Sequence, residues 1–215
     1  MTDWPVLASL PPAERDELLR AGRRRRFAKG EVVFHHGDPA DSLHLLDSGR
    51  VAVRVLTPQG EQAILTILGP GQVFGELALI DGHAHRTATI TALQACETIV
   101  LRRRQFDKLR ELHPQVNTFL LASLAAQVNR LSEHLLDVLF SPTPHRVQRR
   151  LLILADEFDG EPIAITQEDL ALMAGTTRTT VNEILRDLER RGTIRIGRGR
   201  LEMLDRAALA RRVRG

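Results

Sequence analysis

Four residues in one stretch of the sequence have the chemistry of a binding site for a small anion. Gly75 and Glu76 are followed, ten residues after the glutamate, by Arg86 and Thr87. Glycine lets backbone N–H groups approach an anion, arginine offers phosphate a planar fork of donors, and threonine adds a hydroxyl. A carboxylate repels phosphate, so Glu76 suits a hydroxyl donor, as on a ribose. An Arg–Glu ion pair that closes a loop explains the same spacing equally well.

A second set of residues, near the C-terminus, has the pattern of a DNA-reading motif. Thr166 can cap a helix over 168–173, and Gly175 suits the turn that follows. Thr177 can cap a second helix with an apolar stripe of Val181, Ile184, Leu185 and Leu188. A short helix, a turn with glycine and a second helix with outward polar residues predict a helix-turn-helix. The predicted DNA-binding residues on it are Thr177, Arg178, Thr179, Thr180, Asn182 and Glu183.

The residues after this motif predict a basic hairpin, the wing of a winged helix. Residues 193–196 and 200–204 form two strands around a Gly-Arg-Gly turn, so that Arg198 and Arg200 can contact phosphates. The charge distribution agrees, because the chain from His145 onward has 14 Arg and 11 acidic residues, whereas residues 1–144 have 16 basic and 16 acidic residues. A solvated basic hairpin in a protein-interaction module is the alternative.

The elements that must position the anion site are predicted to be β-strands. Between Gly30 and Leu101, short apolar alternations are broken by glycine, which is typical of an all-β sandwich or roll. A short helix over 11–21 precedes it, and the run Arg23–Arg26 is expected to be a solvated face before the roll. The predicted interior residues are Val33, Leu45, Val53, Ile64, Ile67, Val73, Ile90 and Ile99.

A long helix is predicted between Pro114 and Ser141. Six apolar residues follow each other at intervals of 3-4-3-4-3, the seam of a coiled coil, which favours a parallel homodimer. A single amphipathic helix lying on its own domain is the alternative, and Phe119, Leu120, Leu136 and Leu139 widen the apolar face enough for both roles. The predicted dimer-interface residues are Leu121, Leu124, Val128, Leu131, Leu135 and Val138.

The Ser-Pro-Thr-Pro stretch breaks this helix and predicts a hinge. The expected fold is therefore α+β, with an N-terminal roll, a long central helix and a C-terminal winged helix-turn-helix. The expected domain boundaries are 1–112, 113–140, 141–144 and 145–215.

Composition narrows the class of protein. No apolar run approaches the roughly 18 residues of a membrane span, and no signal pattern opens the sequence, so a cytoplasmic location is expected. The single cysteine, Cys96, excludes an internal disulfide and a cysteine-rich metal site, and its apolar surroundings predict a buried small hydrophobe. No Ser/His/Asp or Cys/His set shares an evident site, so the protein is not expected to be an enzyme.

Nearly the whole chain resembles the cyclic-AMP receptor protein (CRP/FNR) family of bacterial transcription regulators. The resemblance is carried by GQVFGELALIDGHAHRTATITA, by the long helix and by QEDLALMAGTTRTTVNEILRDLERRG, in that order. It implies a cyclic-nucleotide-binding jelly roll, a dimerisation helix and a winged helix that binds a two-fold symmetric operator of double-stranded DNA. Contact with RNA polymerase is a further possibility within this family.

The resemblance also implies roles for individual residues. Gly75, Arg86, Thr87 and the Ala88 amide would hold the cyclic phosphate, and Glu76 the ribose 2′-hydroxyl. Ser132 falls where the dimer helix of the family offers a hydroxyl to the base. The implied effector is cAMP, with cGMP as an alternative and no metal. The full set of predicted ligand-binding residues is Gly75, Glu76, Leu77, Arg86, Thr87, Ala88, Leu131 and Ser132.

The sequence departs from the family at positions that bear on specificity. Leu131 stands where cAMP-responsive members carry a threonine, and Gln127 where they carry an arginine. The Arg86-Thr87 pair resembles that of cyclic-GMP-binding domains. Thr179 and Glu183 replace a glutamate and an arginine of the reading helix, which predicts a different operator.

Three other interpretations remain open at this point. The protein could be a ligand-independent member of the same family, or a nucleotide-sensing protein-interaction module that does not bind DNA. The third interpretation is a haem or metal site, suggested by His35, His36, His83 and His85. The lack of a cysteine near the loop of His83 and His85 disfavours it.

Overall fold

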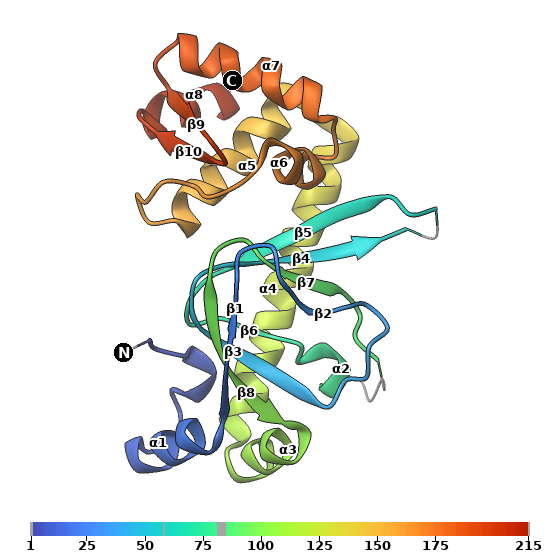
Figure 1. Ribbon diagram of the computed structural model, residues 1–215, viewed down its shortest axis with the longest axis vertical. Coiled ribbons are helices and arrows are strands. Elements are labelled where there is room, and N and C mark those ends of the chain that lie inside the picture. The colour runs from blue at the N-terminus through green and yellow to red at the C-terminus, as the bar shows by residue number, and fades with distance from the viewer. Residues whose placement is uncertain (1, 58, 81–84, 215) are drawn as a thin grey trace. The chain divides into compact units, whose positions relative to one another are not determined.

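The computed structural model describes residues 2–57, 59–80 and 85–214, and it divides the chain into two units. The first unit comprises residues 1–61 and 65–130, and the second comprises residues 62–64 and 131–215. Each unit has its own set of buried apolar residues, and Figure 1 shows the helices and strands of the chain. Among the described residues, no helix is both long enough and apolar enough to cross a membrane.

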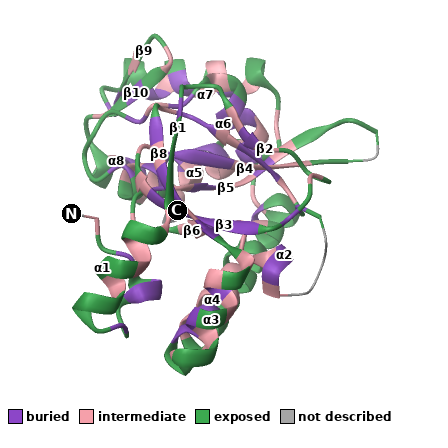
Figure 2. Cartoon of the chain, turned by 60° about the horizontal axis from the view of Figure 1, so that its bottom comes forward, coloured by how far each residue is buried: buried purple, intermediate pink, exposed green. Residues whose placement is uncertain are grey.

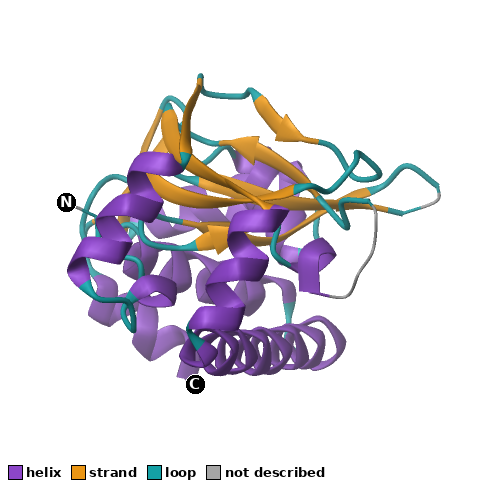
Figure 3. Cartoon of the chain, turned by 90° about the horizontal axis from the view of Figure 1, so that it is seen from below, coloured by secondary structure: helices purple, strands orange, loops and turns teal. Residues whose placement is uncertain are grey.

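The first unit is a roll of two four-stranded antiparallel sheets (Figure 3). The sheet orders are β1-β8-β3-β6 and β2-β7-β4-β5. The strands are β1 (Arg23–Phe27), β2 (Val32–Phe34), β3 (Ser42–Ser48), β4 (Val51–Leu56), β5 (Gln62–Leu68), β6 (Val73–Phe74), β7 (Thr89–Ala92) and β8 (Cys96–Arg102). Short helices accompany them: η1 (Pro5–Leu7), α1 (Pro12–Ala21), α2 (Leu77–Ile80) and α3 (Arg103–Leu112).

The apolar pattern explains which strands form the centre of the roll. Strand β3 lies between β8 and β6, and its first five residues are buried (Figure 2). Six of the eight predicted interior residues are buried, as expected, and Val53 and Val73 are half-buried because they line a cavity. Cys96 is buried, as predicted, and burial raises the pKa of its thiol to about 11, which disfavours the reactive thiolate.

The roll begins earlier than the sequence predicted. Arg23–Phe27 is strand β1, which pairs antiparallel with β8, so the arginine run belongs to the sheet instead of preceding it. Its four arginines are exposed, as expected of a solvated face. Arg24 donates to Asp47 at 2.7 Å and to Glu97 at 2.8 Å, and Arg26 donates to Glu97 at 2.9 Å. Asp47 and Glu97 are distant in the sequence, and their carboxylates allow four consecutive arginines to form an edge strand.

One long helix, α4 (Pro114–Phe140), begins in the first unit and ends in the second. Val116 and Leu120 bury one side of its first turns in the core of the roll. The predicted seam is on another side, and five of its six residues are exposed. The helix therefore covers its own domain with one face and leaves a second apolar face uncovered in the single chain.

The second unit is a winged helix-turn-helix. It consists of α5 (Thr143–Glu157), α6 (Gln167–Ala174), α7 (Arg178–Arg190), the hairpin β9 (Ile194–Gly197) and β10 (Arg200–Met203), and α8 (Arg206–Arg214). Its core is apolar and contributed by every helix, with Val147, Leu151, Leu154, Phe158, Leu170, Val181, Leu185, Leu188 and Leu209 all buried. The predicted helix 168–173 is one residue longer at each end.

The turn between β3 and β4 gives a test of the packing of the roll. Gly49 has φ +77, and a Cβ there would lie 2.3 Å from Ala95 O, whereas Gly30 has φ +84 with no atom within 4 Å. Gly30→Ala should lower the free energy of unfolding by about 1–2 kcal/mol through backbone strain alone. Gly49→Ala should lower it by about 1–3 kcal/mol more, because overlap adds to the strain.

Urea denaturation followed by tryptophan fluorescence measures this difference. Trp4 is the single tryptophan of the chain and is buried in the first unit, so its emission reports on the roll. Equal losses in the two variants would show that the turn is free to move away from β8.

Candidate functional site

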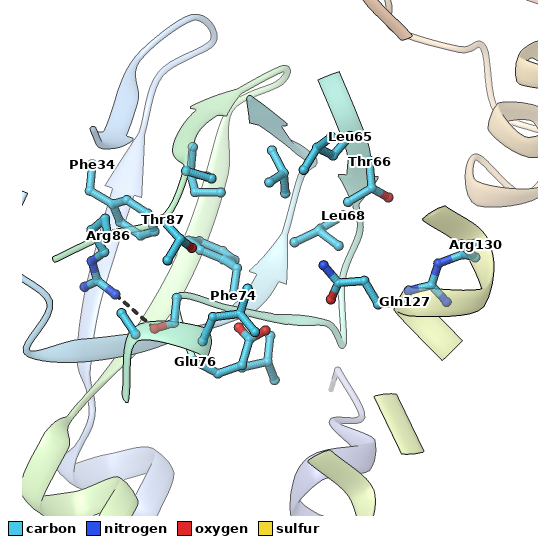
Figure 4. Close-up of a pocket in the computed structure, with 17 residues that line it drawn as sticks. Phe34, Leu65, Thr66, Leu68, Phe74, Glu76, Arg86, Thr87, Gln127 and Arg130 are labelled. Atoms are coloured by element: carbon cyan, nitrogen blue, oxygen red, sulfur yellow. Dashed lines mark hydrogen bonds between the residues drawn. The ribbon is translucent and has the colours of Figure 1, made fainter. Parts of the chain in front are cut away.

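The guanidinium of Arg86 is buried at one end of the roll, with an exposed fraction of 4% for the residue. Nη1 donates to Ser42 O at 2.6 Å, and Nη2 donates to Ser42 Oγ at 3.1 Å. Nη1 also donates to Gly75 O at 3.1 Å, which is the dashed line in Figure 4. The guanidinium carbon lies 4.2 Å from the centroid of the Phe34 ring, a cation–π contact. These contacts fix the side chain in one orientation.

One donor of Arg86 is left without a partner. Within the described part of the chain, the buried Nε makes no hydrogen bond. Burial lowers the pKa of Arg86, yet an arginine remains protonated in a protein. A fixed positive charge with a free, desolvated donor is suited to an anion, because an unsatisfied buried donor costs free energy until a ligand accepts from it.

Gly75 allows this arrangement because it has no side chain. Its φ is +83, and a Cβ would lie 2.6 Å from Arg86 Nη1 and 3.4 Å from Ser42 O. Any larger residue would displace the guanidinium as well as strain the backbone. The glycine of the sequence motif is therefore explained by the arginine eleven residues later.

Glu76 lines the same cavity as Arg86. Burial raises the pKa of its carboxyl group, and the charge of Arg86 opposes this rise. Its backbone carbonyl accepts from Leu79 N at 2.9 Å and from Ile80 N at 3.0 Å, which ties the residue to α2. Among the described residues, the Glu76 carboxylate forms no ion pair with Arg86, so the loop-closing ion pair considered from the sequence is not observed.

The cavity has a charged end and an apolar wall. Figure 4 shows Arg86, Thr87 and Glu76 toward one end of the cavity and Gln127 and Arg130 of α4 at the other. The apolar side chains of Leu65, Leu68 and Phe74 lie between the two ends. Such a cavity can hold an anionic group at one end and a flat ring along the apolar wall. All residues of this cavity belong to the first unit. They are Phe34, Val53, Leu65, Thr66, Leu68, Val73, Phe74, Gly75, Glu76, Leu77, Ala78, Arg86, Thr87, Ala88, Ile90, Gln127 and Arg130.

A buried histidine supports this end of the roll without adding charge. His44 stacks on Phe74 with ring centroids 4.9 Å apart, and its Nδ1 lies 3.1 Å from Thr98 Oγ1. Burial, together with the charge of Arg86, lowers the pKa of His44 to about 3. The ring is therefore neutral at ordinary pH, and Arg86 supplies the positive charge at this end of the cavity.

Six of the eight predicted ligand residues line the cavity: Gly75, Glu76, Leu77, Arg86, Thr87 and Ala88. Leu131 and Ser132 follow Arg130 on α4, both are exposed, and their role stays a prediction. Sequence reasoning missed Phe34, Ser42 and Arg130. The first two act through contacts between distant strands, whereas the spacing of Gln127 and Arg130 by three residues could have placed both on one face of the helix.

The DNA-reading motif has the caps that the sequence predicted. Thr166 Oγ1 accepts from Asp169 N at 3.0 Å, and Thr177 Oγ1 accepts from Thr180 N at 3.2 Å. Gly175 ends α6 with φ +60. Along the start of α7 the predicted residues Thr177, Arg178, Thr179 and Glu183 are exposed, and Thr180 and Asn182 are half-buried.

The wing offers two arginines that are not paired with carboxylates. Arg195 forms a cross-strand ion pair with Glu202 at 2.9 Å. Arg198 and Arg200 are both exposed, and neither has a carboxylate within 4.0 Å among the described residues. Their charge is available to phosphates.

The histidines considered from the sequence do not form a described metal cluster. His35 and His36 are exposed, and His85 Nδ1 lies 2.9 Å from Gly37 O. His83 lies outside the described residues. Within residues 2–57, 59–80 and 85–214, no group of three or more His, Cys, Asp or Glu side chains is placed to hold a metal ion.

Comparisons with known proteins assign both units. Residues 24–113 match the model of the cyclic nucleotide-binding domain, and residues 145–212 match that of the Crp-like helix-turn-helix domain. The "CRP-like cAMP-activated global transcriptional regulator" of Mycobacterium tuberculosis is 34% identical over 87% of each chain. The chain belongs to the CRP/FNR family.

Two further relatives cover almost the entire length. The "Cyclic AMP receptor protein" of Thermus thermophilus is 33% identical over 97% of this chain and 96% of its own. The crystal structure of the Thermus thermophilus catabolite activator protein is 32% identical over 98% of this chain and 99% of its own, with a TM-score of 0.56. This CRP/FNR member is accordingly a cyclic-nucleotide-binding transcription regulator with a helix-turn-helix DNA-binding domain, and its relatives are named as regulators, not enzymes.

The fit of Gly75 against Arg86 gives a test of the cavity. Gly75→Ala should weaken cyclic-nucleotide binding at least about tenfold, roughly 1.4 kcal/mol, because the new Cβ displaces the guanidinium. Gly30→Ala is the matched control, since it has the same backbone conformation with free space around it. Fluorescence titration at equal folded fraction measures both affinities, and an unchanged affinity in Gly75→Ala would disprove this role of the glycine.

Proposed function

We propose that this CRP/FNR member is a homodimeric transcription regulator activated by cAMP, and that it binds a two-fold symmetric operator. The observation that supports the ligand assignment most strongly is the free Nε of the buried, fixed Arg86 at the charged end of the cavity. Two of its relatives are named as cAMP-activated or as a cyclic AMP receptor protein.

The residues of the cavity fit the parts of a cyclic nucleotide. Arg86, Thr87 and the backbone amide of Ala88 hold the cyclic phosphate, and Gly75 keeps that end open. Glu76 accepts from the ribose 2′-hydroxyl, which avoids direct repulsion between its carboxylate and the phosphate. Since Ser42 and Gly75 already hold Arg86 in place, little ordering of this side chain opposes binding.

The base end of the cavity favours adenine through Gln127. A glutamine amide can pair with both N6 and N7 of adenine. Arg130 lines the same end, and an arginine can pair with O6 and N7 of guanine, so cGMP is the competing ligand. Leu131 and Ser132 are proposed to complete the base site from the next positions of α4.

The uncovered face of α4 supports the homodimer. Leu121, Val128 and Leu135 have exposed fractions of 68%, 60% and 58%, and Leu124, Leu131 and Val138 complete the seam. A second copy of the helix would bury these side chains with the heptad spacing of a parallel pair. Two winged helices could then enter successive major grooves about 34 Å apart, with Arg178, Thr179, Asn182 and Glu183 at the bases.

Calorimetric titration with cAMP and cGMP tests the ligand assignment. The wild type should bind cAMP more tightly than cGMP. Arg86→Leu should lose at least about tenfold in affinity for both nucleotides, since a hydrogen bond to a charged group contributes about 1.5–3 kcal/mol. Arg104→Leu is the control, because Arg104 is an exposed arginine of α3 outside the cavity.

Each other outcome of the titration has a definite meaning. Full affinity in Arg86→Leu would reject the phosphate site. Tighter binding of cGMP than of cAMP would indicate that Arg130, and not Gln127, recognises the base. Binding of neither nucleotide would reject cAMP activation and leave a regulator with a different effector or none.

A second test concerns DNA reading. Arg178→Ala should weaken binding to a selected operator by about 1–3 kcal/mol and leave binding to random duplex nearly unchanged, if Arg178 contacts a base edge. Arg186→Ala, an exposed arginine farther along α7, should affect neither affinity by more than about twofold. Electrophoretic mobility shifts at fixed salt measure the affinities for operator and for random duplex. An equal loss of affinity for every sequence would show that Arg178 contacts a phosphate and not a base edge.

A further inference from the structure

The side chain of Arg146 lies where three segments of the second unit meet. Its Nη1 donates to Ser141 O at 3.0 Å, its Nε to Ala174 O at 3.0 Å, and its Nη2 to Gly175 O at 3.1 Å. Ser141 follows the last residue of α4, and Ala174 and Gly175 end α6 just before the DNA-reading helix α7. One side chain on α5 thus joins the end of α4 to the turn before α7.

Helix geometry explains why an arginine suits this place. The last carbonyls of a helix have no partner within it and carry a partial negative charge. Two such ends, those of α4 and α6, present carbonyls to the same guanidinium. The rigid fork of an arginine can donate in three directions at once, whereas a lysine provides a point charge on a flexible stem.

Further contacts connect the end of α4 to the same unit. The Asp137 carboxylate pairs with Arg149, and His134 contacts Arg150, so the last turns of α4 are bound to α5. A Cβ built on Gly175 would lie 3.8 Å from Val138 Cγ2, which places the turn against α4. Arg146 adds its three hydrogen bonds to this contact.

We infer that Arg146 is a positioning residue for DNA reading: it fixes the orientation of α7 relative to the end of α4. The inference rests on the proposed function, in which α7 reads the operator and α4 carries the effect of the nucleotide. Because base contacts depend on the angle of the reading helix and phosphate contacts depend on it much less, Arg146 should govern specificity more than total affinity.

The experiment compares Arg146→Met and Arg146→Lys with Arg206→Met. Arg206 is the matched control, because it donates twice to Asp156, at 3.0 and 2.9 Å, and joins α8 to α5 in the same unit. The measured quantity is the ratio of affinities for a selected operator and for random duplex, with and without cAMP. Arg146→Met should lower this ratio at least about tenfold, roughly 1.4 kcal/mol, and reduce the gain produced by cAMP.

The remaining variants separate geometry from charge and from general stability. Arg146→Lys should resemble Arg146→Met, because charge without the fork cannot bind all three carbonyls. Arg206→Met should keep the ratio within about twofold of the wild type. Hydrogen exchange in the absence of DNA should be faster at residues 174–181 in Arg146→Met than in Arg206→Met.

An unchanged ratio in Arg146→Met, or an equal loss in Arg206→Met, would overturn the assignment. A wild-type affinity ratio in Arg146→Lys would show that a positive charge alone is sufficient and that the forked guanidinium is not needed. This result would overturn the assignment as well. A wild type that ignores cAMP would reject the proposed activation, and the affinity ratio without nucleotide together with the exchange data would still decide the role of Arg146.

Discussion

The buried guanidinium of Arg86 makes contacts that connect the two sheets of the roll. A buried charge is strongly unfavourable unless hydrogen bonds replace its hydration. Here the replacement comes from Ser42 at the start of β3, from Gly75 after β6 and from the ring of Phe34 at the end of β2. Since β2 belongs to one sheet and β3 and β6 to the other, the arginine joins both sheets at the end where the cavity opens. The contacts that hold the two sheets together and the proposed anion site therefore use the same side chain.

The contacts and pKa shifts of these residues also determine the charge of the cavity. Arg86 makes three hydrogen bonds to protein atoms, and its Nε has no partner among the described residues. His44, which stacks on Phe74, is neutral and adds no second positive charge. Glu76 lines the cavity with a carboxyl group whose pKa burial raises and Arg86 lowers. A dianionic or bare phosphate would meet repulsion from that carboxylate, whereas a monoanionic cyclic phosphate beside a hydroxyl satisfies both groups. The chemistry of the cavity thus favours a nucleotide over inorganic phosphate.

What could be predicted from the sequence is mainly what local interactions determine. The caps at Thr166 and Thr177 bond to amides three residues away, and the period of α4 is visible in the residues themselves. The partners of Arg86 could not be found in this way, because Ser42 is 44 residues distant and only strand pairing brings it near. The basic strand β1 was misplaced for the same reason, since its counter-charges come from Asp47 and Glu97.

The two functional ends of the chain are connected by one continuous helix, and this constrains how they can communicate. Gln127 and Arg130 of α4 line the cavity, the uncovered seam includes Val128 and Leu131, and the helix ends at the carbonyl held by Arg146. In the proposed function, a change at residues 127–130 on nucleotide binding would be carried toward residue 140 by the hydrogen-bonded backbone of this helix. Residues that line the cavity and residues of the predicted seam thus occupy neighbouring positions of one helix, and the proposal therefore links nucleotide contact to helix pairing. Within the second unit, Arg146 joins the end of α4 to the turn before α7, and this is why we assign it the positioning role.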